Sequence, residues 1–175
     1  PAHTVNEHWK YASMIMNLIR ESAGLGAFTV TQENWKIPNG QSKSLAERTW
    51  ETTKHHISIF VERESAIFQT VYDELTQSHN DVERIRSHGG AGAMPNLEAV
   101  KNAIGMISPH ISLRVLNGNT NDRLRYDVEP DVDSDNVKMP ADVYTIAIGG
   151  ANLGRGITLS GLCTTVFLTN QGADD

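Results

Sequence analysis

Apolar residues recur at alternating steps of four and three near the start of the chain, at Val5, Trp9, Ala12, Met16 and Ile19. This period predicts an amphipathic helix, and we expect it to end near Gly24-Leu25-Gly26. A turn-rich segment follows, and Ser44 then has the right residue type to cap a second helix. We therefore expect residues 1–54 to form a helical N-terminal extension with a turn-rich linker.

The run HHISIFVERESAIFQTVYDELTQ fits two structures. One is a single long helix over residues 44–77, because its apolar residues also suit a helical period. The other is a buried strand over Ile57 to Val61, followed by a turn and a helix, because this stretch is compact and rich in β-branched residues. We favour the strand, since a helix over 44–77 is unusually long for a small domain.

Three further apolar runs predict strands at residues 111–116, 143–148 and 162–168. Before them, Asn96 is a good cap for a helix from Leu97 to Ile107, which Ser108-Pro109 stops. The segment 119–142 is too polar and acidic for a core. This order of elements favours an α/β domain over residues 55–175, with a largely parallel sheet flanked by helices and an acidic insert at 119–142.

The amino-acid composition limits the classes of protein to which this chain can belong. The chain has 175 residues, of which 39% are hydrophobic and 21% charged, as in soluble globular domains. No apolar run approaches the length of a membrane span, no leader peptide is recognisable, and the one cysteine, Cys163, cannot form an internal disulfide. We expect a cytoplasmic protein without membrane partners. The net charge of −6 argues against a protein that coats nucleic acid by charge alone, although the acidic stretch 127–135 carries most of it and leaves room for a local basic surface.

A glycine pair, Gly149-Gly150, follows the expected strand at 143–148, where parallel sheets bind ligands. Glycine there lets the backbone come close to a ligand or take a positive φ. The run from Gly149 to Gly156 begins like a phosphate-binding P-loop, but Arg155 replaces the lysine and Gly156 the hydroxyl residue. Since another strand follows in place of a helix, we conclude that this is not a P-loop.

No other sequence motif strongly indicates a metal site or a catalytic residue. The acidic run DVDSDNVKMPAD lacks the glycine and final glutamate of a calcium loop, and the seven histidines lack the spacing of metal ligands. Ser160 does not lie in a nucleophile motif. We therefore expect neither a metal site nor catalytic residues in this chain.

The segment IAIGGANLGRGITLSGLCTTVFL is similar to the signature of the Z-one (Z1) domain family. The similarity is strong over residues 143–168 and extends more loosely over 55–170. It includes Arg155-Gly156-Ile157-Thr158, which also resembles the fifth conserved motif of superfamily-two helicases. The matching positions are Gly149, Gly150, Leu153, Arg155, Gly156, Thr158, Leu159, Gly161 and Leu162.

The resemblance implies the second, C-terminal RecA-like half of a superfamily-two helicase-type ATPase from a bacterial restriction or phage-defence system. On this basis Gly149, Gly150 and Asn152 would approach the DNA backbone. Arg155, Gly156 and Thr158 would lie at the nucleotide cleft. The implied cofactors are ATP and magnesium in the full-length protein. The implied partners are double-stranded DNA, the other RecA-like half, and nuclease or methyltransferase components.

The chain contains no Walker lysine and no magnesium-binding Asp-Glu box. It stops at Asp174-Asp175, before the arginine-rich motif that the family resemblance implies. We therefore expect a RecA-like domain that is truncated at its C-terminus and neither binds nor hydrolyses ATP by itself. Two alternatives stay open: a stand-alone α/β module that binds a small phosphorylated ligand at Gly149-Gly150, and a protein-docking domain.

Overall fold

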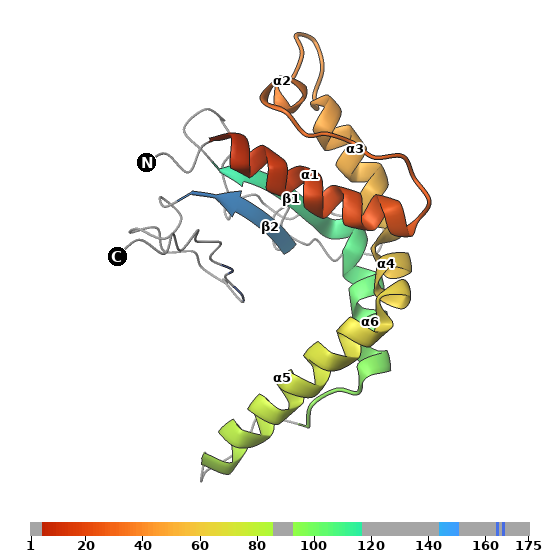
Figure 1. Ribbon diagram of the computed structural model, residues 1–175, viewed down its shortest axis with the longest axis vertical. Helices are drawn as coiled ribbons and strands as arrows, with labels where there is room; N and C mark the ends of the chain where they lie inside the picture. The colour runs from red at the N-terminus through yellow and green to blue at the C-terminus, as the bar shows by residue number, and fades with distance from the viewer. Residues whose placement is uncertain (1–4, 86–92, 117–143, 151–163, 165, 167–175) are drawn as a thin grey trace, which may run out of the picture.

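The computed structural model describes residues 5–85, 93–116 and 144–150, together with residues 164 and 166. This part of the chain is a mixed α/β structure, mostly helical, with two parallel strands (Figure 1). Its elements in chain order are α1 (Val5–Ser22), α2 (Gln32–Trp35), α3 (Leu45–Thr53), η1 (Lys54–His56), α4 (Ile57–Arg63), α5 (Ser65–Ile85), α6 (Leu97–Ile107), η2 (Ser108–His110), β1 (Ile111–Leu116) and β2 (Tyr144–Gly149).

Helix α1 confirms the first sequence prediction. Trp9, Ala12, Met16 and Ile19 of its apolar stripe are buried, and Ala12 and Met16 are completely inaccessible to solvent. The helix ends as expected near Gly24, whose φ of 68° lies in the left-handed region that glycine tolerates best. Beyond this turn, the backbone returns along α1, where the Ser13 hydroxyl accepts from Val30 N and Asn17 Oδ1 accepts from Phe28 N, both at 2.8 Å.

The strand expected at Ile57 to Val61 is wrong, because these residues form α4. Ile57 and Val61 are both buried, whereas Ile59 between them is 46% exposed. That spacing is the helical period, in which residues four apart share a face. The alternative of one unbroken helix over 44–77 is wrong too, since α3, η1, α4 and α5 follow one another with breaks at His56 and Glu64.

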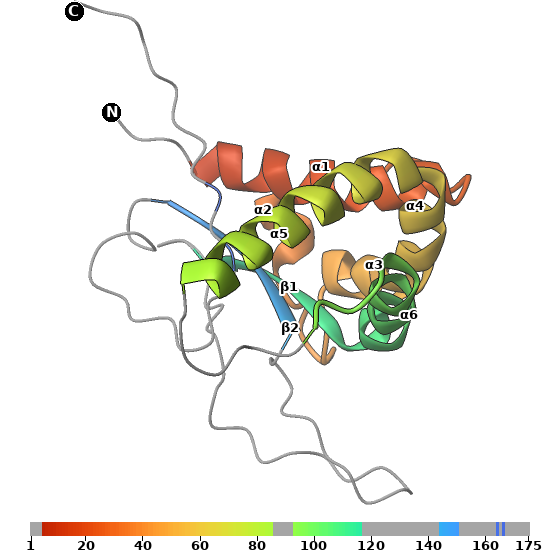
Figure 2. The same cartoon turned by 90° about the horizontal axis from the view of Figure 1, so that it is seen from below.

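The helix caps and the first two strands agree with the sequence. Ser44 accepts from Glu47 N, Asn96 accepts from Ala99 N, and both helices begin at the next residue. β1 and β2 pair in parallel from Ile111 opposite Tyr144 to Leu116 opposite Gly149, and Figure 2 shows them side by side. The strand expected at 162–168 and the insert at 119–142 lie outside the described ranges, apart from residues 164 and 166. A larger sheet and a RecA-like arrangement therefore stay predictions.

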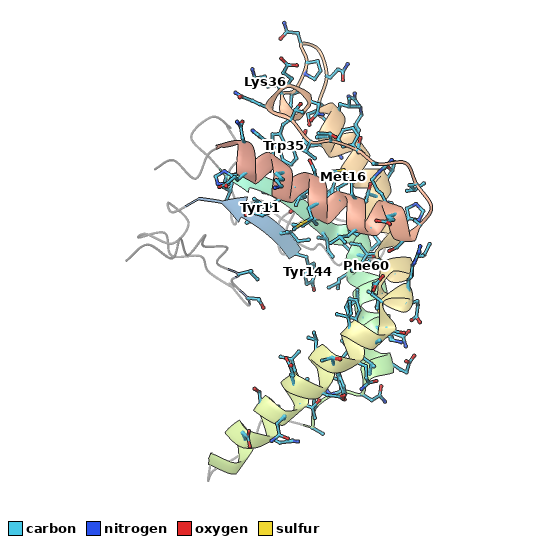
Figure 3. All side chains as sticks on the ribbon, in the orientation of Figure 1. Tyr11, Met16, Trp35, Lys36, Phe60 and Tyr144 are labelled. Atoms are coloured by element: carbon cyan, nitrogen blue, oxygen red, sulfur yellow. The ribbon has the colours of Figure 1, made fainter. Side chains whose placement is uncertain are left out.

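One core joins these elements. α1 packs against both strands, α3 and α4, and its Met16 lies among the buried side chains of the cluster (Figure 3). The core draws on residues before and after position 54, and the domain boundary expected there stays a prediction. None of the described helices combines the length and the apolar character needed to cross a lipid bilayer.

Trp50 connects α3 to the sheet, because its indole Nε1 donates to the carbonyl of Ile111 at 2.8 Å. Trp9 offers a comparison. It is buried to a similar degree, but its Nε1 has no hydrogen-bond partner among the described residues. Among the described residues, the indole N–H of Trp50 makes a hydrogen bond that phenylalanine cannot make, whereas the indole N–H of Trp9 makes none and its ring packs on Trp35, with centroids 5.8 Å apart.

We predict that Trp50→Phe lowers the free energy of unfolding by roughly 1 to 3 kcal/mol more than Trp9→Phe does. Both changes remove similar apolar area, but Trp50→Phe alone takes the donor away from a buried carbonyl. Urea denaturation of the two variants measures the difference. Equal losses would show that the bond from Trp50 to Ile111 contributes nothing.

Candidate functional site

The carboxyl ends of β1 and β2 form the described part of the candidate site. Leu116 and Gly149 are paired at the last position of the ladder, and Gly150 follows directly. Ligands of open parallel sheets bind at this edge of the sheet. The N-terminal end of α1 lies at the same edge, as Figure 1 shows.

Two of the site residues expected from the sequence, the adjacent Gly149 and Gly150, lie within the described residues. Gly149 closes β2, and both glycines are partly buried. Asn152, Arg155, Gly156 and Thr158 lie outside the described residues. The roles expected for these four therefore stay predictions.

Gly150 contacts a residue from the other end of the chain. A Cβ atom added to Gly150 would lie 3.2 Å from Nε2 and 3.3 Å from Cε1 of His8. Contacts this short are tighter than most that real Cβ atoms make. The φ of Gly150 does not lie in the left-handed region. A side chain at position 150 would therefore crowd the imidazole of His8, which would have to give way by a few tenths of an ångström.

Sequence reasoning missed His8, although a signal was present. Residue 8 lies three residues after Val5 and four before Ala12, so it belongs to the apolar stripe of the first helix. A histidine on such a stripe is buried when the helix packs. Its contact with Gly150 was beyond prediction, because no local pattern links residues so distant in sequence.

His8 is held in an environment that favours its neutral form. The side chain is 7% exposed, and its Nδ1 is buried without a hydrogen-bond partner among the described residues. Burial lowers the pKa of the imidazole, and the neighbouring Glu7 carboxylate acts in the opposite direction with a smaller effect. The carboxyl end of β2 thus meets an uncharged imidazole and the backbone of Gly149-Gly150.

A second region rich in charge lies at the opposite, amino end of β1. A cleft of about 280 Å³ there is lined by Trp50, by Ile111 and by charged side chains of α3, β1 and the adjoining loops. Its charges pair with one another: Lys54 with Glu51 at 3.1 Å, Lys43 with Glu51 at 3.7 Å, and Arg114 with Glu47 at 3.7 Å. Of these pairs, Arg114–Glu47 joins β1 to α3, whereas the two pairs of Glu51 connect α3 to residues just before and after it. Within the described part of the chain, no group of three or more potential metal ligands occurs.

Comparison with known proteins gives one match. The model of the Z1 domain matches residues 29–175, which include both strands, the glycine pair and the Arg155 motif. The match begins within the turn-rich segment after α1. No curated protein and no solved structure matches the chain.

We predict that stability depends on pH through His8. In the unfolded chain the imidazole has its ordinary pKa near 6.5, whereas the pKa is lower in the folded state. Below about pH 6.5 the unfolded state therefore binds more protons, and the free energy of unfolding falls as the pH falls. His8→Gln, which cannot titrate, should weaken this dependence between about pH 7.5 and about pH 5.5, measured by urea denaturation. His55→Gln, at an exposed histidine, serves as the control and should keep the original dependence.

We also predict that Gly150→Ala destabilises the fold through His8. The added methyl group forces the buried imidazole to move, and His8→Ala removes the obstacle. Gly150→Ala should therefore cost less in the His8→Ala background, with a coupling of roughly 0.5 to 3 kcal/mol in a double-mutant cycle. Gly26→Ala is the matched control, since an added Cβ meets nothing within 4 Å there. Additive losses at positions 8 and 150 would contradict this account.

Proposed function

Because the chain belongs to the Z1 domain family, we propose that it is a segment of a DNA-translocating, helicase-type ATPase in a bacterial restriction or phage-defence system. In this proposal it is a cytoplasmic, RecA-like half that contributes a DNA-backbone surface and one wall of an ATP cleft. The other RecA-like half supplies the Walker lysine and the magnesium-binding residues. Nuclease or methyltransferase components complete the system.

We base this proposal chiefly on one observation. A parallel strand ends in a glycine pair, and the sequence then continues through Asn152 to Arg155-Gly156-Ile157-Thr158. Backbone amides and small side chains contact phosphates of DNA without reading the sequence of bases. A guanidinium group binds phosphate oxygens through two parallel hydrogen bonds. The segment therefore offers the two kinds of donor that a DNA backbone and a nucleotide need.

The described surroundings of Gly150 support this reading. The glycine lacks a side chain, and the neighbouring imidazole is neutral, so neither adds a negative charge that would repel phosphate. The amino end of α1 at the same edge is the positive end of the helix dipole, which favours anions, and Glu7 in its first turn acts in the opposite direction. ATP, when bound, supplies the phosphoryl bond whose cleavage drives the motor. In this chain Arg155 would orient phosphate oxygens, and the glycine turn would hold backbone phosphates of DNA.

The same edge also favours a second candidate, a self-contained module that binds a small phosphorylated ligand. Here the helix N-terminus and the glycine pair alone would hold the phosphate. Isothermal titration of this chain with ATP and with inorganic phosphate distinguishes the two. Binding of either by this chain without the other RecA-like half favours the second candidate. No binding, together with activity of the full-length ATPase, favours the first.

We predict that Arg155→Ala in the full-length ATPase lowers the rate of DNA-dependent ATP hydrolysis by about a hundredfold, as loss of one charged phosphate contact does. Arg48→Ala is the control, because Arg48 is an exposed arginine of α3 distant in sequence from the motif. Its hydrolysis rate should stay that of the parent protein. An undiminished rate in Arg155→Ala, with the protein folded, would remove the basis for placing this residue at the nucleotide.

A further inference from the structure

Helix α5 forms an arm that extends away from the rest of the described structure. It contains 21 residues, which corresponds to a length of about 31 Å. It follows α4 after a break at Glu64, and Figure 1 shows it leaving the group formed by α1, α4 and α6. Figure 2, seen from below, shows the same helix coming forward from that group.

The arm carries an apolar stripe that faces solvent. Ile67, Val71 and Leu75 succeed one another at steps of four residues, so they share one face of the helix. Their exposed fractions are 59%, 47% and 54%. Single exposed apolar residues are ordinary, but a contiguous stripe marks a surface that binds something.

At its base, the stripe opens into a cleft. This cleft has a volume of about 310 Å³ and lies between α1, α4 and the start of α5. Leu18, Phe60 and Ile67 supply its apolar wall, and Figure 3 labels Phe60 at this junction. Phe60 also meets Phe68 edge to face, with ring centroids 6.0 Å apart, and thereby fixes the base of the arm. A partner side chain could enter the cleft while its neighbours lie along the stripe.

The charges around this surface are acidic. Glu21 and Glu64 border the cleft, and Glu74 lies one turn beyond Val71 on the same side of α5. These three carboxylates form no ion pair among the described residues, whereas Arg63 beside them donates to the carbonyls of Glu21 and Ser22. From residue 57 to residue 81 the chain has five acidic side chains and a single arginine. A second copy would bring like charges together, so a basic partner fits better.

We propose that the stripe of Ile67, Val71 and Leu75, with the cleft at its base, binds a basic amphipathic helix of another protein. The partner helix places apolar residues at steps of three and four on the stripe, and one larger side chain in the cleft. Its lysine or arginine residues face Glu21, Glu64 and Glu74. This role is independent of any nucleotide or DNA contact at the carboxyl end of β2.

The test uses the whole chain and a fluorescent synthetic helix with leucine at steps of three and four and lysine elsewhere. Binding is followed by fluorescence anisotropy. We expect binding that weakens as salt rises, and no binding of the same helix with glutamate in place of lysine. Val71→Asn should weaken binding about tenfold or more, because a buried valine contact is lost while every charge is kept.

Ala66→Asn is the matched control. Ala66 is exposed on the other side of α5, and asparagine there reduces helix propensity at least as much as at position 71. It should bind like the parent chain, and Glu64→Gln with Glu74→Gln should reduce the salt dependence. Equal binding by Val71→Asn and Ala66→Asn, or equal binding of the acidic helix, would overturn the proposal. A dimer in sedimentation that Val71→Asn abolishes would overturn it as well, since the occupant would then be a second copy.

Discussion

The packing of α1 against the two parallel strands is the contact on which the rest of the described structure depends. Two strands alone are not stable in water, and the buried Leu113 and Val115 of β1 share their core with α1. Ala12 and Met16 are completely buried there, so the helix cannot slide along the sheet without opening cavities. Because a helix is stiff, this packing also fixes His8 about two turns further toward the N-terminus. The core therefore determines which side chain meets Gly150 at the carboxyl end of β2.

Elements governed by local rules could be predicted from the sequence. The stripe of α1, the caps at Ser44 and Asn96, and the strands β1 and β2 all follow from spacing or from one residue type. The segment from Ile57 to Val61 could not, because its short apolar run suits a buried strand and a buried helix equally well. Packing decided between them. This segment packs against α1 and α6, and only a helix buries Ile57 and Val61 there while it exposes Ile59.

Of the site residues expected from the sequence, only the two glycines lie within the described residues, and their expected contact with DNA stays a prediction. The glycine pair was recognised as a place where something comes close to the backbone, and in the described structure that group is His8. The His8 side chain and a phosphate can both lie next to Gly150 only if they approach the backbone from different faces. His8 takes one face of Gly150. A phosphate bound at Gly150 would therefore have to approach the backbone from the other face.

Helix α5 shows how an element can be anchored and still leave its apolar stripe uncovered. Amphipathic helices owe most of their stability to burial of one face, yet α5 only partly buries Phe68 at its base and leaves Ile67, Val71 and Leu75 about half exposed. Complete burial of a fully exposed side chain of this size is worth about 1.5 to 3 kcal/mol, and about half of that remains for each of these half-exposed side chains. That free energy is not used within the described structure, so it is available for association. Because the Phe60–Phe68 contact already fixes the base of the arm, a partner loses less entropy in ordering it. An acidic rim around an ordered apolar stripe thus selects a partner by charge and holds it by burial.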